Sequence, residues 1–187
     1  MEVDLLDPWT SDLPEVDGDL LAAKYGGITG TSLTPAQDAA WAAIRTLAAR
    51  FQRADLLLFS VPLWNYGIPY KLKHLIDAIS HKDILFSFDE RGLNGLLGGR
   101  PAVAIYARGL GYGPESPTPD ARFGLEKTYL ETWFSFVGLT QTHSLIAEQV
   151  LGPHGDDIVA RAEIEAARLA ATLSAGAKEA IVMGPAP

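Results

Sequence analysis

The feature that most constrains the fold of this chain is a pair of short apolar runs, each followed by a segment with helical periodicity. Residues 55–61 read DLLLFSV and residues 101–107 read PAVAIYA. Apolar runs of this length without alternation are typical of strands that are covered on both faces, as in a parallel sheet. Because helical patterns separate the runs, the sequence predicts an α/β fold with a parallel sheet.

Further segments extend this alternation to four predicted strands, because residues 3–6 and 141–148 also have strand character. The first long helix is expected to begin at Pro35, where Thr34 and Gln37 can form a capping box. The later helices share an apolar stripe at helical spacing, and they are expected to begin at Pro69, at Thr118–Pro119 and at Asp156. Three other segments are expected to be less regular: one or two helical turns within 17–25, a loop at 26–32 and a frayed tail from residue 183.

Composition narrows the function classes. The chain has 187 residues, a length typical of one domain, and we expect residues 1–187 to form a single domain. It has no cysteine, which excludes disulfides, thiolate nucleophiles and cysteine metal sites, so any redox chemistry needs a bound cofactor. The four histidines are scattered and predict no metal site.

Charge and hydropathy argue against nucleic-acid and membrane functions and favour a cytoplasmic location. The net charge of -8 argues against binding of nucleic acid or of an anionic membrane. The longest apolar run, around residues 56–63, is too short to cross a bilayer. The N-terminal residues have no signal-peptide pattern, so we expect a cytoplasmic protein.

The loop after the first buried run is the strongest candidate for a ligand site. It contains Trp64, Asn65 and Tyr66 directly after the predicted strand. In parallel sheets, ligands bind beyond the carboxyl ends of the strands. Two aromatic faces and one amide suit a flat heteroaromatic ligand with a polar edge. The alternative is that the aromatics only pack in the core and that Asn65 forms a turn.

A second loop, residues 108–113, follows the other buried run and reads RGLGYG. Its glycines would let backbone N–H groups approach a ligand closely, where they could stabilise an anionic edge. The alternative is an ordinary surface loop. The sequence has no nucleophile elbow, phosphate-binding Walker motif or pair of carboxylates suited to hydrolysis.

Four segments resemble one known family. Residues 62–77, 86–100, 107–111 and 128–139 are similar, in order and spacing, to the FMN-dependent NADH:azoreductases and NADH:quinone reductases of flavodoxin-like fold. The resemblance extends over about residues 35–173, and the aromatic-Asn-aromatic stretch after residue 62 is its most specific part. It implies a three-layer sandwich with a central parallel sheet.

The resemblance also implies a mechanism and a set of site residues. FMN would bind noncovalently, NADH or NADPH would reduce it by hydride transfer, and a quinone or azo compound would then be reduced in the same pocket. Asn65 and Tyr112 would act at the polar edge of the flavin ring. The remaining cofactor contacts would come from Pro62, Leu63, Trp64, Tyr66, Ala107, Arg108, Gly109 and Leu110. Family members are homodimers, and Phe86 and Phe88 match the segment that covers the substrate pocket at the interface.

The chain differs from this family in the second loop and in its N-terminal part. The usual Ser-Arg-Gly-Gly is replaced by residues 107–110, with Ala107 and Leu110 as the differences, and Tyr112 stands where relatives have histidine. The first predicted strand matches the family's second, so the central strand and the phosphate loop after it have no counterpart. Either the chain starts late, at an internal Met, or the protein is a truncated relative with reduced FMN affinity.

Two other functions compete with the oxidoreductase. A flavodoxin-like domain that binds no flavin and serves as a scaffold would explain the absent phosphate loop. An electron carrier without a nicotinamide site is a third possibility, and inability to accept hydride from NADH would favour it.

Overall fold

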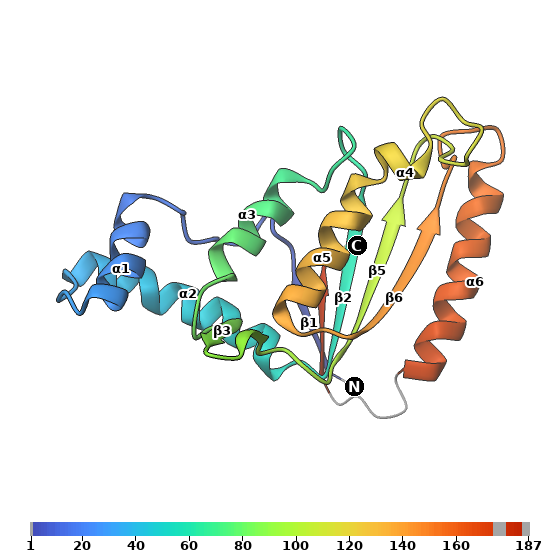
Figure 1. Ribbon diagram of the computed structural model, residues 1–187. Helices are drawn as coiled ribbons and strands as arrows, with labels where there is room; N and C mark the ends of the chain where they lie inside the picture. The colour runs from blue at the N-terminus through green and yellow to red at the C-terminus, as the bar shows by residue number, and fades with distance from the viewer. Residues whose placement is uncertain (1, 174–178, 185–187) are drawn as a thin grey trace.

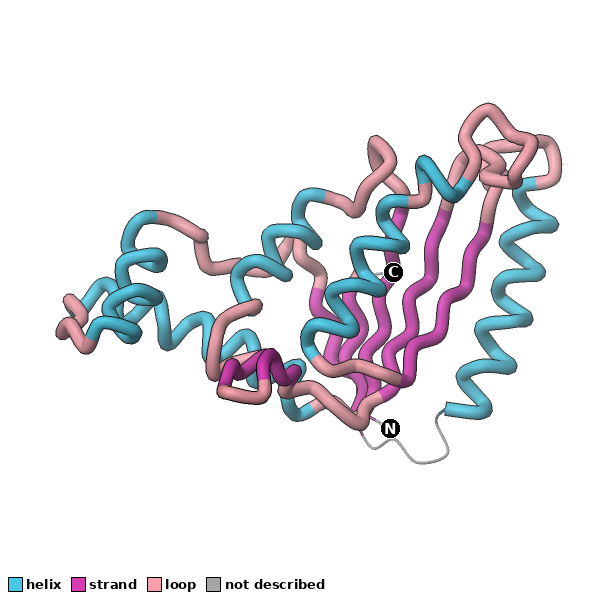
Figure 2. The backbone as a smooth tube through the Cα atoms, in the orientation of Figure 1, coloured by secondary structure: helices cyan, strands magenta, loops and turns pink. Residues whose placement is uncertain are grey.

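The fold is built around a five-stranded parallel sheet with helices on both faces, as a computed structural model shows (Figures 1 and 2). The structure describes residues 2–173 and 179–184. The strands of the main sheet are β1 (Glu2–Leu6), β2 (Leu56–Pro62), β5 (Pro101–Ala107), β6 (Gln141–Ala147) and β7 (Glu179–Met183). The helices are α1 (Gly18–Thr29), α2 (Pro35–Arg53), α3 (Tyr70–Ile79), α4 (Asp120–Phe123), α5 (Leu125–Val137) and α6 (Gly155–Leu173). The predicted α/β class and parallel sheet are therefore confirmed.

The strand order β1-β7-β2-β5-β6 places the last strand of the described chain beside the first. The connections from β2 to β5 and from β5 to β6 step in one direction, with α3 and α5 on one face of the sheet (Figure 1). The connection through α6 steps back, and α6 lies on the other face. This switch of face is what the right-handed crossover rule requires when a chain reverses direction across a sheet.

Strand β7 was not predicted from the sequence. It fills the place between β1 and β2 for which the sequence analysis found no strand, and it pairs in parallel with both neighbours. The expectation that the tail frays from residue 183 was wrong at Met183, which is 1% exposed and ends this strand. Residues 185–187 lie outside the described residues. The sequence pattern missed β7 because its apolar run, from Ala180 to Met183, is short and stands close to the end of the printed sequence.

The hydrophobic core lies between the sheet and the helices α2, α3 and α5. Alternate residues of β2, β5 and β7 point into it, with Leu57 and Phe59 from β2 and Ala104 from β5 as examples. Phe59 contacts the ring of Phe134 on α5 at a centroid distance of 5.0 Å. This packing holds the carboxyl ends of the strands in a fixed arrangement, which is where the two candidate loops begin.

The helix ends follow the sequence signals in part. The capping box between Thr34 and Gln37 is present at the start of α2, as predicted. Helix α1 has 12 residues and includes part of the segment expected to be a loop. The helix expected after Thr118–Pro119 is interrupted at Gly124, which separates α4 from α5. Helix α6 begins at Gly155, so Asp156 lies in its first turn and is not its cap.

A short antiparallel hairpin, β3 (Phe86–Asp89) and β4 (Gly92–Gly95), was also missed by the sequence analysis. Its last residue, Gly95, lies directly against the backbone of Gly138 at the end of α5. The hairpin lies at the amino end of the main sheet, away from the two candidate loops (Figure 1). Among the described helices, none combines the length and the apolar character needed to cross a membrane.

A buried histidine gives the fold a pH dependence. His81 is 2% exposed and its ring lies 5.1 Å from that of Trp41. Burial, with the nearby charge of Lys24, lowers the pKa of His81 below its ordinary value of 6.5. The unfolded chain therefore takes up this proton first as the pH falls, so the free energy of unfolding decreases below about pH 6.5 until the folded protein also protonates.

We expect His81→Phe to remove this part of the pH dependence while it retains the ring contact with Trp41. Urea unfolding between pH 8 and pH 5 measures the slope. His154→Gln is the matched control, because its side chain is 77% exposed. An unchanged slope in His81→Phe would show that other groups cause the acid destabilisation.

Candidate functional site

A cavity of about 400 Å³ opens where the carboxyl ends of four strands meet. Its walls come from the carboxyl ends of β2, β5 and β7, from the segments that follow β1, β2 and β7, and from the start of α3. The lining residues are Pro8, Trp9, Ser60, Pro62, Trp64, Pro69, Leu72, Ala107, Met183 and Gly184. This position is where open parallel sheets bind their ligands, and the volume lies in the range of small-molecule sites.

The loop after β2 is a tight turn with an unusual backbone. Trp64 and Gly67 exchange two backbone hydrogen bonds, of 3.0 and 2.9 Å, across Asn65 and Tyr66. Both central residues have positive φ, 49° for Asn65 and 67° for Tyr66. Asparagine tolerates this left-handed region, whereas tyrosine adopts it at an energetic cost. Such strained residues cluster at functional sites, where the surrounding structure fixes them.

The turn directs its side chains to two sides. Trp64 faces the cavity at the strand ends, where its ring lies 5.3 Å from that of Trp9. Asn65 and Tyr66 instead line a neighbouring cavity of about 650 Å³, bordered by α3 and α5. Tyr66 also contacts the ring of Phe123 at 4.9 Å. The loop therefore separates two cavities, and its polar amide lies on the side of the larger one.

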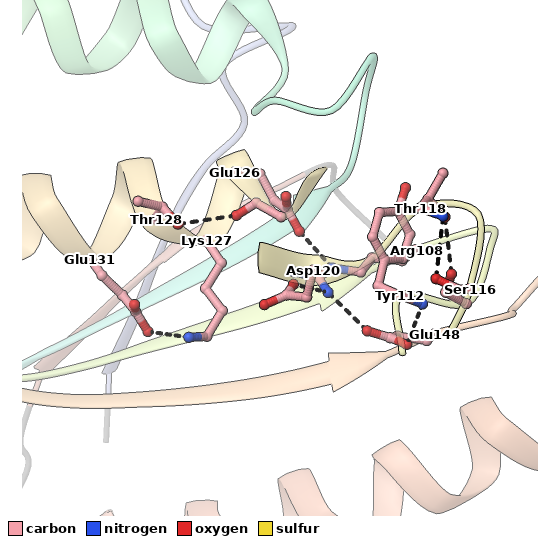
Figure 3. A network of polar contacts seen from close by, with 12 residues as sticks. Arg108, Tyr112, Ser116, Thr118, Asp120, Glu126, Lys127, Thr128, Glu131 and Glu148 are labelled. Carbon is pink, nitrogen blue, oxygen red and sulfur yellow. Dashed lines mark hydrogen bonds and ion pairs between the residues drawn. The ribbon is translucent and has the colours of Figure 1, made fainter. Parts of the chain in front are cut away.

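Arg108, the first residue after β5, is buried at the centre of an ion-pair cluster (Figure 3). Its Nε donates to Glu126 at 2.6 Å, and its Nη1 donates to Asp120 at 2.7 Å and to Glu148 at 2.8 Å. The side chains of Arg108 and Glu126 are 1% and 0% exposed. The cluster thus joins the second loop to α4, to the first turn of α5 and to the residue that follows β6.

The electrostatics of this cluster keep Arg108 charged. Burial would lower its pKa, but the contacts with Asp120, Glu126 and Glu148 outweigh burial, and the pKa of Arg108 is raised. Three carboxylates surround one guanidinium, so the loss of this cation would leave a fully buried Glu126 without its counter-charge. The Arg108 side chain therefore binds carboxylates of the protein itself, and these contacts hold the second loop in place.

Tyr112 belongs to the same cluster. Its backbone N–H donates to Glu148 at 2.9 Å, and the Arg108 guanidinium lies 4.8 Å from its ring centre. The residue is 4% exposed, and burial, together with the charge of Glu126, raises the pKa of its phenol. Tyr112 thus remains a hydrogen-bond donor at neutral pH. The cluster orients both the backbone and the ring of this residue.

The other predicted site residues are placed in three ways. Ala107 lines the cavity, and its carbonyl accepts the backbone N–H of Leu63 at 3.0 Å, which ties the two loops together. Gly109 lies against Leu151, where an added Cβ would come within 2.8 Å of its side chain, and Leu110 is 58% exposed. The structure does not bring Phe86 and Phe88 to these loops: they lie on β3, where Phe86 contacts Phe136 and Phe88 is 64% exposed.

Sequence reasoning missed several residues of the site. Trp9 was not singled out from the sequence, although its ring contacts those of both Trp64 and Tyr70. Met183 and Gly184 were missed with β7. The carboxylates around Arg108 come from three separate segments, and no spacing rule links them. A signal for Glu148 existed, because it directly follows β6 and so lies at the carboxyl edge of the sheet.

The parallel sheet, with helices on both faces and a cavity at the carboxyl ends of its strands, defines an α/β protein of flavodoxin-like architecture. Residues 1–170 match the protein family described as having the flavodoxin-like fold, and the chain belongs to this family.

Comparison with individual proteins gives closer relatives. The chain is 52% identical over 173 residues to FMN-dependent NADH:quinone oxidoreductase 9 of Burkholderia lata, with 91% of this chain and 82% of the relative covered. It is 49% identical over 169 residues to FMN-dependent NADH:quinone oxidoreductase 3 of Pseudomonas fluorescens, with 89% and 78% covered. Among solved structures, an azoreductase from Bacillus anthracis strain Sterne has a TM-score of 0.80 at 27% identity, with 89% of this chain and 80% of that chain covered.

Proposed function

We propose that this protein is an FMN-dependent NAD(P)H oxidoreductase that reduces quinones, azo compounds or both. The observation that carries the proposal is the cavity at the strand ends, with Trp9 and Trp64 on its walls and the strained Asn65–Tyr66 turn beside it. Relatives named as FMN-dependent NADH:quinone oxidoreductases support it, and their names favour NADH as the electron donor. When bound, FMN would supply the hydride and electron chemistry, while the protein positions the ring and its partners.

The residues present fit the flavin ring. The cavity is mainly apolar and is bordered by two indole rings, which suits a flat heteroaromatic ring. Gly184 keeps it open, because a Cβ at this position would lie 2.8 Å from the Cβ of Ser60. Among the described residues that line it there is no lysine or arginine. Any phosphate bound there would therefore depend on backbone N–H groups or on residues outside the described part.

Each predicted site residue has a proposed role. Pro62, Leu63, Trp64, Ala107, Gly109 and Leu110 would form the walls and backbone contacts of the ring site. Asn65 and Tyr66 line the second cavity, so they would meet the flavin where its ring extends past the turn into that cavity, and Arg108 would fix the loop that carries Tyr112. The second cavity, which Tyr66, Tyr70 and Tyr129 line, would receive the aromatic electron acceptor.

Asn65→Ala is expected to weaken FMN binding by about tenfold, the cost of a lost hydrogen bond at the polar edge of the ring. Fluorescence titration with FMN measures the change. Asn65→Gly separates the amide from the backbone, because glycine accepts the positive φ of this position without strain. Both variants should bind equally weakly. Wild-type affinity in Asn65→Gly would show that the amide makes no contact with the flavin.

Tyr112→Phe is expected to slow flavin reduction about tenfold while FMN affinity changes less than about twofold, since a donor to a developing negative charge acts mainly in the transition state. Stopped-flow reduction by NADH gives the rate, and titration gives the affinity. Tyr25→Phe is the matched control, because Tyr25 is 60% exposed on α1. Equal losses of rate and affinity in Tyr112→Phe would contradict the proposed role.

We further propose that the chain acts as a single-domain cytoplasmic homodimer. Phe86 and Phe88 support a dimer, because within one chain their hairpin lies at the opposite end of the sheet from the cavity. In a dimer they could cover the pocket of the partner subunit. Sedimentation of the protein with and without Phe88→Ser tests this: the wild type should sediment as a dimer, and the variant should dissociate more readily.

A flavin-free scaffold domain is the second candidate function, favoured by the lack of a basic side chain for a phosphate among the described lining residues. An assay of NADH oxidation with a quinone acceptor distinguishes the two functions. The enzyme should oxidise NADH only when FMN and protein are both present, at a rate well above that of free FMN. A rate equal to free FMN would contradict the proposed function.

A further inference from the structure

The last described strand of the chain forms part of the wall of the candidate site. Strand β7 runs parallel to β1 and β2, and Leu57 is the neighbour of Ile181 in the register. Its carboxyl end brings Met183 and Gly184 to the cavity, and the N–H of Gly184 donates to the carbonyl of Leu6 at 3.3 Å. Without β7, the cavity would lose the wall between Trp9 and Ser60.

The attachment of β7 to the rest of the protein is asymmetric. On the core face, Ile181 and Met183 are 0% and 1% exposed. On the other face, Val182 borders an apolar groove of about 200 Å³ between the sheet and α6. Gly155 is the one residue of α6 that is buried among the described residues. The helix that leads toward β7 is therefore loosely packed, and β7 is held mainly by backbone pairing and two core side chains.

We propose that docking of β7 into the sheet and binding of the flavin are coupled, with Met183 and Gly184 serving as cofactor-site residues. This inference rests on the proposed function. A ligand that binds only the docked state stabilises that state by mass action, and the coupling is reciprocal. Undocking of β7 would remove Met183 and Gly184 from the wall of the cavity and release the ligand. Occupancy of the site would thus be linked to the docking of β7.

The absence of cysteine in the chain allows a direct test of the position of β7. Leu58 and Val182 are register neighbours whose side chains both line the groove beneath α6, outside the main core. The double variant Leu58→Cys/Val182→Cys should form an intramolecular disulfide on oxidation. Leu58→Cys/Val103→Cys is the matched control, because it joins β2 to β5 on the same face and does not involve β7. A disulfide in the control alone would overturn the proposal.

The rate of cysteine alkylation measures the coupling between docking of β7 and binding of the flavin. Ile181→Cys places a thiol on the core face of β7, outside the residues that line the cavity, so FMN cannot shield it directly. Leu57→Cys, its fully buried neighbour on β2, reports global unfolding. Without FMN, Ile181→Cys should react faster than Leu57→Cys, because β7 opens locally.

Saturation with FMN, at about 100 times its Kd, should slow the alkylation of Ile181→Cys by up to about 100-fold. A slowing of about tenfold or more supports the coupling, and any smaller effect overturns it. If Ile181→Cys does not fold, the same comparison is made on the rate of disulfide formation in Leu58→Cys/Val182→Cys with and without FMN. Failure of the proposed function would appear separately, as an absence of FMN binding by the unmodified protein.

Discussion

Arg108→Ala is expected to lower the free energy of unfolding by about 3–5 kcal/mol, the usual cost of removing one partner of a buried ion pair. The expectation rests on Glu126, which is fully buried and has Arg108 as its ion-pair partner. Asp120 and Glu148 lose less, because their side chains are 51% and 31% exposed and can be hydrated. Urea unfolding followed by circular dichroism measures the change.

Three further variants test whether the loss of stability comes from the buried pair of Arg108 and Glu126. Arg91→Ala removes an exposed arginine from the hairpin and should change stability by less than about 0.5 kcal/mol. Arg108→Lys should recover only part of the loss, because an ammonium cannot reproduce the fork of contacts to three carboxylates. Arg108→Met/Glu126→Leu should be more stable than Arg108→Ala, since no buried charge remains unpaired at this pair. A loss below about 1 kcal/mol in Arg108→Ala would contradict the account of the cluster.

Gly95→Ala is expected to destabilise the protein by about 3 kcal/mol, at the upper end of the range for overpacking. A Cβ at this position would lie 2.1 Å from the backbone nitrogen of Gly138 and equally close to the carbonyl carbon of Val137. Backbone on both sides cannot rotate away, so the hairpin and the end of α5 would have to separate. Thermal unfolding of the variant measures the effect.

Gly98→Ala is the matched control for this prediction. Its Cβ would lie 3.6 Å from the carbonyl oxygen of Gly138, an ordinary contact, and its stability should be close to that of the wild type. Because the hairpin carries Phe86 and Phe88, Gly95→Ala should also weaken any dimer that these residues support. Equal stabilities of the two variants would show that Gly95 and Gly138 are less closely packed than described.

The parts of the fold that the sequence predicted correctly are those with strong local signals. The apolar runs of β2 and β5 are compatible only with a buried strand or a short buried helix. The flanking turn residues favoured the strand. The capping box fixed the start of α2, because the side chains and backbone N–H groups of both Thr34 and Gln37 take part in it. The first site loop was found for the same reason, since two aromatics and an amide directly follow a buried strand.

The parts that were missed depend on contacts between distant segments. Strand β7 has a short apolar run, and its place between β1 and β2 is set by pairing across more than a hundred residues. Arg108 was assigned to the cofactor from the family resemblance, whereas its burial depends on carboxylates from α4, from α5 and from the residue after β6. The break at Gly124 between α4 and α5 could not be predicted either, because the helical spacing of apolar residues continues across it.

The most direct test of the central claim is a titration of the purified protein with FMN, followed by quenching of flavin fluorescence. We expect saturable binding of one FMN per chain, because the cavity with two indole walls lies at the strand ends. The same titration with riboflavin shows how much of the affinity depends on the phosphate, for which the described lining residues offer no basic side chain. Absence of saturable binding of either flavin would contradict the assignment of this cavity as a flavin site.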